Sequence, residues 1–168
     1  KELGRFSGAE QSYTQAIALK SDFAEAHSNL GNTLQEQGRL DEAKASYTQA
    51  IALKPDFALA HSNLGVTLKE MGRLDEALSV YIQAINLNPD FIDTYVNLSI
   101  AIKNVKFNSS NPKLYPPLTQ LLTNGNFTRP TDVAGSILSL LKHDIQIKDL
   151  LLKNNFAVSL NEATSIIE

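Results

Sequence analysis

Three asparagines recur at matched positions about 34 residues apart, at Asn29, Asn63 and Asn97. An asparagine amide offers one acceptor oxygen and two N–H donors, which are the complements of the groups that a peptide backbone exposes. Regularly spaced amides could therefore hold an extended peptide backbone whatever its side chains are. The alternative interpretation is that each asparagine only bonds a neighbouring turn of its own chain.

Two histidines and two acidic pairs are the other candidates for chemistry. His27 and His61 are one repeat apart, whereas a metal site needs ligands that converge, so we interpret both as packing residues. The pairs Asp41-Glu42 and Asp75-Glu76 stand where helical patterns begin, and helix capping together with the helix dipole accounts for them. The sequence contains no phosphate-binding glycine loop and no recognisable nucleophile–base pair. We therefore expect no enzymatic activity, no cofactor and no metal.

Composition and charge restrict the class of protein. Hydrophobic residues make up 43% of the chain and charged residues 20%, which is typical of a globular protein. The net charge is −3 without a basic block, which argues against a nucleic-acid partner. No apolar run approaches the roughly 18 residues of a membrane span, and no signal peptide is visible. The absence of cysteine fits a reducing compartment, so we expect a cytoplasmic protein.

The asparagines belong to a repeat that dominates the sequence. Residues 24–57 recur at 58–91 with roughly two positions in three identical. Each copy holds two apolar helical periods, separated by a glycine such as Gly38 and closed by a proline such as Pro55. Glycine readily takes the left-handed conformation that ends a helix, and proline cannot donate an intrahelical hydrogen bond. The pattern predicts an antiparallel helix pair in each copy.

Small and large residues alternate within the pair, at Asn29-Leu30-Gly31, Ala43, Tyr47, Ala50 and Pro55, and again at Leu64, Gly65, Ala77, Tyr81, Ala84 and Pro89. This alternation resembles the pattern of the tetratricopeptide repeat. The repeats are similar to those of O-linked N-acetylglucosamine transferases and of bacterial multi-repeat proteins. The resemblance implies an all-α fold, an α-α superhelix (a solenoid) of antiparallel helix pairs. Small residues such as Gly31, Ala43 and Ala50 would then lie where the two helices approach closely.

The repeat pattern covers the first part of the chain, and a helical C-terminal region follows. We divide residues 1–104 into a partial repeat (1–23), two full repeats (24–57 and 58–91) and the first helix of a degenerate repeat (92–104). Residues 105–168 would cap the stack or begin a following domain. Within them we expect a loop up to the Pro116-Pro117 pair, then helices over 117–123, 130–142 and 145–153 and from Ser159. The chain starts without Met and stops inside a helical pattern, so we expect it to be part of a longer protein.

The resemblance also implies where a ligand would bind, because the first helices of such pairs line a concave face. The expected peptide-binding residues are Asn29, Asn63, Asn97, Asn32, Ser28, Ser62, Leu59, Val66, Ile100, Lys69 and Lys103. Asn29, Asn63 and Asn97 form what we call the asparagine ladder. It resembles the asparagine ladder in the repeat region of O-linked N-acetylglucosamine transferases. The chaperone-binding branch of the family uses a carboxylate clamp of Lys and Arg with two Asn. Asn32 and Asn63 match the two asparagines, but Ser28, Asp93 and Asn97 stand at the cationic positions, so such a clamp is disfavoured.

Three hypotheses for function remain open. The first is a non-enzymatic module that binds an extended peptide or a partner segment through the asparagine ladder. The second is a regulatory or substrate-recruiting arm of a larger enzyme, such as a transferase, with its catalytic domain beyond residue 168. The third is end-to-end association into a homo-oligomer, through the apolar stripe of Phe6, Tyr13 and Ile17.

Overall fold

The structure is a computed structural model that describes residues 2–123 and 130–141. Within those ranges it contains helices and no strand, which confirms the predicted all-α class. The helices are α1 (Glu2–Leu19), α2 (Ala24–Glu36), α3 (Leu40–Leu53), α4 (Ala58–Glu70), α5 (Leu74–Leu87), α6 (Ile92–Ile102), the short 3-10 helix η1 (Pro112–Leu114), α7 (Tyr115–Thr123) and α8 (Pro130–Leu141).

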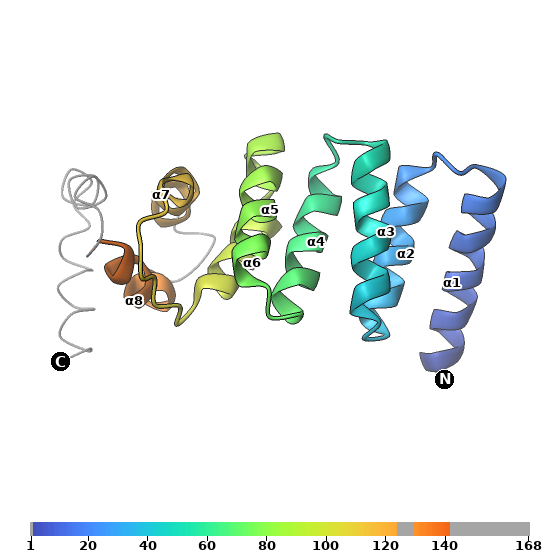
Figure 1. Ribbon diagram of the computed structural model, residues 1–168, viewed down its shortest axis with the longest axis horizontal. Coiled ribbons are helices and arrows are strands. Elements are labelled where there is room, and N and C mark those ends of the chain that lie inside the picture. Colours follow the sequence, from blue (N-terminus) through green and yellow to red (C-terminus); the bar gives the residue numbers. More distant parts are fainter. Residues whose placement is uncertain (1, 124–129, 142–168) are drawn as a thin grey trace. The chain divides into compact units, whose positions relative to one another are not determined.

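The chain divides into two compact units, residues 1–94 and residues 95–168. In the first unit, helices α1 to α5 stand side by side and alternate in direction (Figure 1). Each helix packs on the next one along the chain, and α2 also touches α4. The unit is therefore a stack of antiparallel helix pairs, as the repeat pattern predicts. The predicted boundary at residue 104 stays a prediction.

Glycines end the first helix of each pair as predicted. Gly38 and Gly72 have φ angles of 75° and 76°, in the left-handed region that residues with a Cβ rarely adopt. The amide of Arg39 then donates to the carbonyl oxygen of Leu34 at 2.9 Å, which satisfies one of the last carbonyls of α2. These turns send the chain back antiparallel after only a few residues.

The predicted capping by the acidic pairs is wrong. Helix α3 begins at Leu40, and no side chain caps it with a hydrogen bond. Asp41 and Glu42 lie inside the first turn, two and three residues after the N-cap residue Arg39, so only their favourable position near the helix dipole remains. Glu42 instead accepts a hydrogen bond from Arg39 Nε at 2.7 Å.

Close approach of the paired helices follows from the small residues. Ala43, Tyr47 and Ala50 of α3 are completely buried. A Cβ atom added to Gly31 of α2 would lie 2.7 Å from the Tyr47 ring, and one added to Gly65 would lie 2.5 Å from the Tyr81 ring. Each glycine thus makes room for a tyrosine ring, which confirms that the small residues sit at the helix contacts.

The second unit has a core of its own. The completely or almost completely buried apolar side chains are Tyr95, Leu98, Ile102, Leu114, Leu118, Leu121, Val133, Ile137 and Leu140. The Tyr95 hydroxyl donates to Gln120 Oε1 of α7 at 2.6 Å, and the Ser136 hydroxyl of α8 donates to the carbonyl oxygen of Ile102. Helices α7 and α8 therefore pack with the larger part of α6 in one unit.

The proline pair corrects another expectation. Helix α7 begins at Tyr115, two residues before the predicted start at Pro117, so Pro116 and Pro117 both lie in its first turn. Amides of a first turn have no intrahelical acceptor, so prolines cost no hydrogen bond there. Helix α8 begins at Pro130 as predicted and ends at Leu141. The helices predicted over 145–153 and from Ser159 lie outside the described residues.

Candidate binding surface

A row of amide side chains crosses from α2 to α4 in the first unit. Asn63 Nδ2 of α4 donates to Asn32 Oδ1 of α2 at 2.9 Å. The hydroxyl of Tyr47, which rises from α3 beneath them, donates to the same oxygen at 2.6 Å and approaches Gln35 Oε1 at 3.2 Å. The Thr67 hydroxyl donates to Gln35 Oε1 at 3.0 Å. We call these five residues, Asn32, Gln35, Tyr47, Asn63 and Thr67, the amide wall.

The wall is held in place before any ligand binds. The Tyr47 hydroxyl is a proton donor at neutral pH, as any ordinary tyrosine is, and burial, reinforced by the charges of Glu70 and Glu36, raises its pKa further. Gln35 is held further by donating through Nε2 to Glu70 Oε2 at 3.1 Å. Side chains with fixed rotamers lose less conformational entropy when a ligand binds, which is the advantage of preorganisation.

Several polar groups of this region have no partner within the described parts of the chain. The Asn29 side chain is exposed and makes no hydrogen bond there, although its backbone oxygen accepts from the Thr33 hydroxyl at 3.0 Å. Asn32 Nδ2 and Asn63 Oδ1 also have no hydrogen bond to another described residue. The repeat places Asn29 and Asn63 at equivalent positions of α2 and α4. The amides therefore retain donors and acceptors with which a ligand could pair.

The other residues that the sequence singled out fall into three groups. Leu59 is 42% exposed, while Val66 and Lys69 are half-buried on α4. Ser28 and Ser62 are each only 1% exposed, so their side chains lie inside the helix packing and not at a surface where a ligand could touch them. The third group belongs to the second unit and consists of Asn97, Ile100 and Lys103.

The sequence singles out Asn32 and Asn63 but does not reveal the hydrogen bond between them or the rest of the amide wall. The signal that could have revealed the wall is that two of its amide residues change together at the next repeat. Asn32 and Gln35 are replaced one repeat later by Val66 and Lys69. The buried hydroxyl of Tyr81, equivalent to that of Tyr47, accordingly has no hydrogen-bond partner in the described residues.

The histidines contact the turns that precede their helices. His61 is buried, and its Nε2 lies 3.0 Å from the carbonyl oxygen of Pro55, to which it donates. His27 Nε2 lies 3.3 Å from the carbonyl oxygen of Ser21. Residues 2–123 and 130–141 contain no group of three His, Cys, Asp or Glu residues placed to hold a metal ion. In the same ranges, none of the helices combines the length and hydropathy that crossing a bilayer requires.

Similar proteins of known structure share this architecture. A variant of the O-GlcNAc transferase of Thermobaculum terrenum matches 72% of the chain with 23% identity and a TM-score of 0.61, and the match spans 23% of that transferase chain. The second TPR domain of human RPAP3, solved with the HSP70 peptide SGPTIEEVD, matches 61% of the chain and 86% of its own length, with 25% identity and a TM-score of 0.57.

YrrB, described as a TPR protein with an unusual peptide-binding site, matches 83% of the chain and 68% of its own length, with 19% identity and a TM-score of 0.60. No curated protein sequence matches the chain significantly. Two family models do match it. The model described as TPR repeat covers residues 1–38 and 31–72, and the tetratricopeptide repeat model covers residues 58–91. The chain belongs to the tetratricopeptide repeat family.

Proposed function

We propose that the chain is a non-enzymatic binding module and that the amide wall, together with Asn29, holds an extended polypeptide segment. The observation that carries the proposal is the bond between Asn63 and Asn32, which fixes two amides side by side and leaves Asn32 Nδ2 and Asn63 Oδ1 unpaired among the described residues. A donor and an acceptor on adjacent helices match the carbonyl and N–H groups of an extended backbone.

Two relatives support the general class of ligand. The RPAP3 domain was solved with a bound peptide, and YrrB is described by its peptide-binding site. The ligand we propose here is recognised by its backbone, so its side-chain sequence would vary. Leu59 and Val66, which lie on the same helix as Asn63, would add apolar contacts.

The test is selection of a phage-displayed library of random dodecapeptides on the immobilised protein. We expect the selected peptides to share no fixed polar residue, because the amides read the backbone. The double variant N29A/N63A should weaken their binding at least about tenfold, the loss that corresponds to removing hydrogen bonds worth ~1.4 kcal/mol. Isothermal titration calorimetry with synthetic peptides measures the change.

The matched control is N86A, which removes an exposed asparagine from α5. Peptide affinity should be unchanged in this variant. Binding that survives N29A/N63A at full strength would remove the amides from the mechanism. N97A is measured separately, since Asn97 holds the equivalent repeat position on α6 in the second unit.

A further inference from the structure

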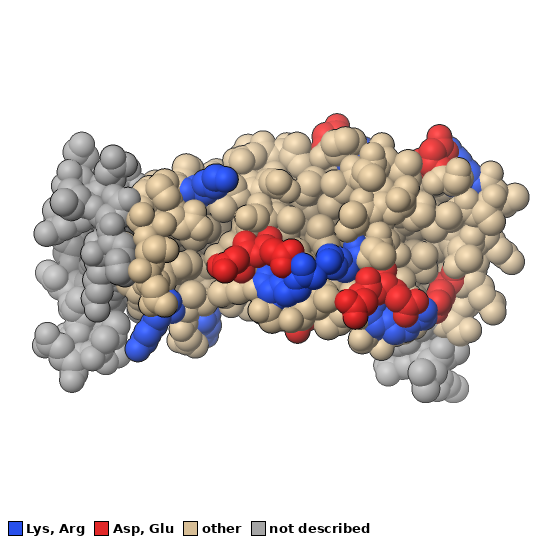
Figure 2. All heavy atoms as spheres, viewed as in Figure 1, with Lys and Arg blue, Asp and Glu red and all other residues tan. Residues whose placement is uncertain are grey.

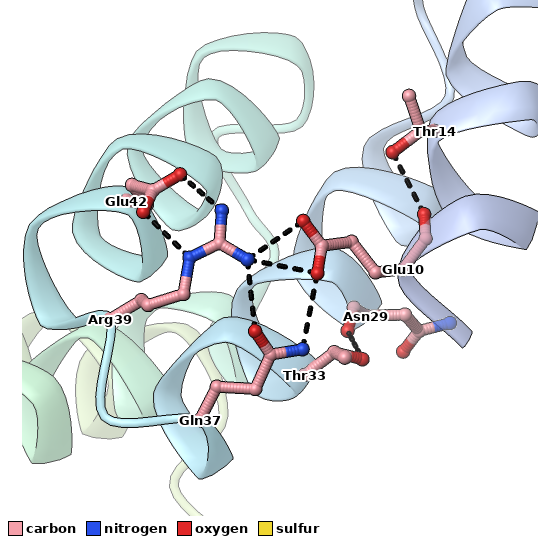
Figure 3. Close-up of polar contacts among 7 residues, drawn as sticks. All are labelled: Glu10, Thr14, Asn29, Thr33, Gln37, Arg39 and Glu42. Atoms are coloured by element: carbon pink, nitrogen blue, oxygen red, sulfur yellow. Dashed lines mark hydrogen bonds and ion pairs between the residues drawn. The ribbon is translucent and has the colours of Figure 1, made fainter. Parts of the chain in front are cut away.

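Charged side chains form a band of alternating sign along one face of the molecule (Figure 2). At the junction of α1 with the following helix pair, Glu10, Gln37, Arg39 and Glu42 form a closed cluster (Figure 3). Arg39 Nη1 donates to Glu10 Oε1 and Oε2 at 2.8 and 2.9 Å, and Gln37 Nε2 donates to Glu10 Oε2 at 3.1 Å. Arg39 therefore ties Glu10 of α1 to Glu42 of α3. We call this arrangement the first junction.

The second junction, one repeat later, keeps only half of the cluster. Arg73 still donates to both oxygens of Glu76, at 2.6 and 2.7 Å. Lys44 replaces Glu10, however, and Met71 replaces Gln37. Within the described parts of the chain, Lys44 forms no ion pair and Arg73 Nη1 has no acceptor. Two cations thus stand where the first junction joins a cation to a carboxylate.

An open groove of about 410 Å³ is lined by Lys44, one of these two cations. Leu64 and Leu68 of α4 and Val80 of α5 give the groove its apolar lining, and Asp75 and Ser79 of α5 also line it. Lys44 and Glu76 line the same groove, and Glu76 carries the hydrogen bonds of Arg73, so the groove and the incomplete cluster are continuous. None of its lining residues belongs to the amide wall.

We propose that the second junction docks a segment of a partner protein in which an Asp or Glu side chain stands beside an apolar one. The partner carboxylate takes the place that Glu10 has in the first junction, where it accepts from Arg73 Nη1 and lies beside Lys44. The neighbouring apolar side chain enters the groove over Leu64 and Leu68.

Charge complementarity favours this occupant. The first junction already holds three carboxylates, of Glu10, Asp41 and Glu42, against the single guanidinium of Arg39. The second junction holds two carboxylates, of Asp75 and Glu76, against two cations. Because the second junction has one carboxylate fewer and one cation more than the first, a further carboxylate is repelled less there. A charge-assisted bond to a guanidinium is also among the stronger hydrogen bonds.

The test is an NMR titration with two short probes, acetyl-Leu-Glu-Leu-amide and acetyl-Leu-Gln-Leu-amide. We expect saturable shifts of the Arg73 Nε–H resonance and of the Leu68 and Val80 signals with the Glu peptide. The Gln peptide, which is isosteric but uncharged, should bind at least about fivefold more weakly, because it lacks the charge-assisted bond.

The variant K44E separates binding from folding. It places a carboxylate next to Arg73, as in the first junction, so it should be at least as stable to heat as the parent and should bind the Glu peptide at least about fivefold more weakly.

Four outcomes would overturn the proposal. They are equal binding of the two peptides, undiminished binding to K44E, peptide-induced shifts confined to the amide wall, and a dimer in sedimentation velocity that K44E dissociates. The last outcome would assign the groove to a second copy of this chain instead of a separate partner.

Discussion

Tyr47 and Tyr81 hold equivalent positions in consecutive repeats and are both completely buried, yet their hydroxyls differ. The hydroxyl of Tyr47 donates to Asn32, whereas that of Tyr81 has no partner in the described residues. The substitution Y47F should therefore lower the free energy of unfolding by about 1 kcal/mol, and Y81F should leave it unchanged or raise it by up to about 1 kcal/mol. Urea unfolding midpoints, compared at equal m-values, measure both effects.

The two variants control for one another, because each removes one oxygen from a buried ring packed against a glycine. An equal loss of stability in both would contradict the assigned role of the Asn32 acceptor. The outcome also bears on the proposed function, since Tyr47 is completely buried and contributes to the amide wall only by holding Asn32 and Gln35 in place.

At the residue scale, the sequence predicts which positions repeat but not how they pair. The spacing of Asn29 and Asn63 follows from the repeat length alone. The bond from Asn63 to Asn32 depends on the lateral offset between α2 and α4, which packing of the intervening α3 sets. The sequence placed Ser28 and Ser62 in the predicted site as well, although their side chains are buried. Rotation of a helix about its axis by a fraction of a turn moves a side chain from the surface to the interior. The periodicity of the sequence does not determine this rotation finely enough to tell the two cases apart.

At the element scale, glycines with opposite surroundings give a direct test of helix contact. A Cβ on Gly31 would meet the Tyr47 ring at 2.7 Å, whereas nothing lies within 4 Å of a Cβ on Gly8 of α1. G31A should cost about 1–3 kcal/mol of stability by overpacking. G8A should gain about 0.5–1 kcal/mol, because alanine favours an exposed helix interior. Thermal unfolding followed by circular dichroism measures both shifts.

Shifts of the same sign in the two variants would contradict this account. If G31A were also stabilising, helices α2 and α3 would have to move apart without losing packing contacts. If G8A were destabilising, the exposed face of α1 near Gly8 would have to be covered.

Element boundaries were predictable where a residue has one dominant conformational effect. Gly38 and Gly72 take the left-handed conformation expected at a helix end. Asp41 was less informative, because a carboxylate can either cap a helix or lie within its first turn, and a shift of one or two residues separates these cases. Pro116 is compatible both with a loop and with a first turn, and the structure has the latter.

At the scale of the whole first unit, ion pairs between different helices are concentrated near the N-terminal end. Glu10 pairs with Arg39 at 2.8 Å, and Glu25 pairs with Lys54 at 3.0 Å. The equivalent positions one repeat later hold Lys44 and Arg73, and Leu59 and Asn88, which cannot form such pairs. Hydrogen bonds from Arg39 and Gln37 lower the pKa of Glu10, and the hydrogen bond from Lys54 lowers the pKa of Glu25. Acid should therefore act unequally along the stack.

The sign follows from linkage. Because folding lowers these two carboxyl pKa values, the ion pairs contribute stability above the usual carboxyl pKa, and this contribution is lost as the pH falls through the lowered values. Hydrogen-exchange protection should consequently fall more in α1 to α3 than in α4 and α5 between pH 7 and about pH 3.5. The variant E10Q/E25Q should show weak protection of α1 to α3 already at pH 7 and little further acid loss there. A uniform loss across all five helices would instead make the unit one cooperative block, whose stability does not depend on where its ion pairs lie.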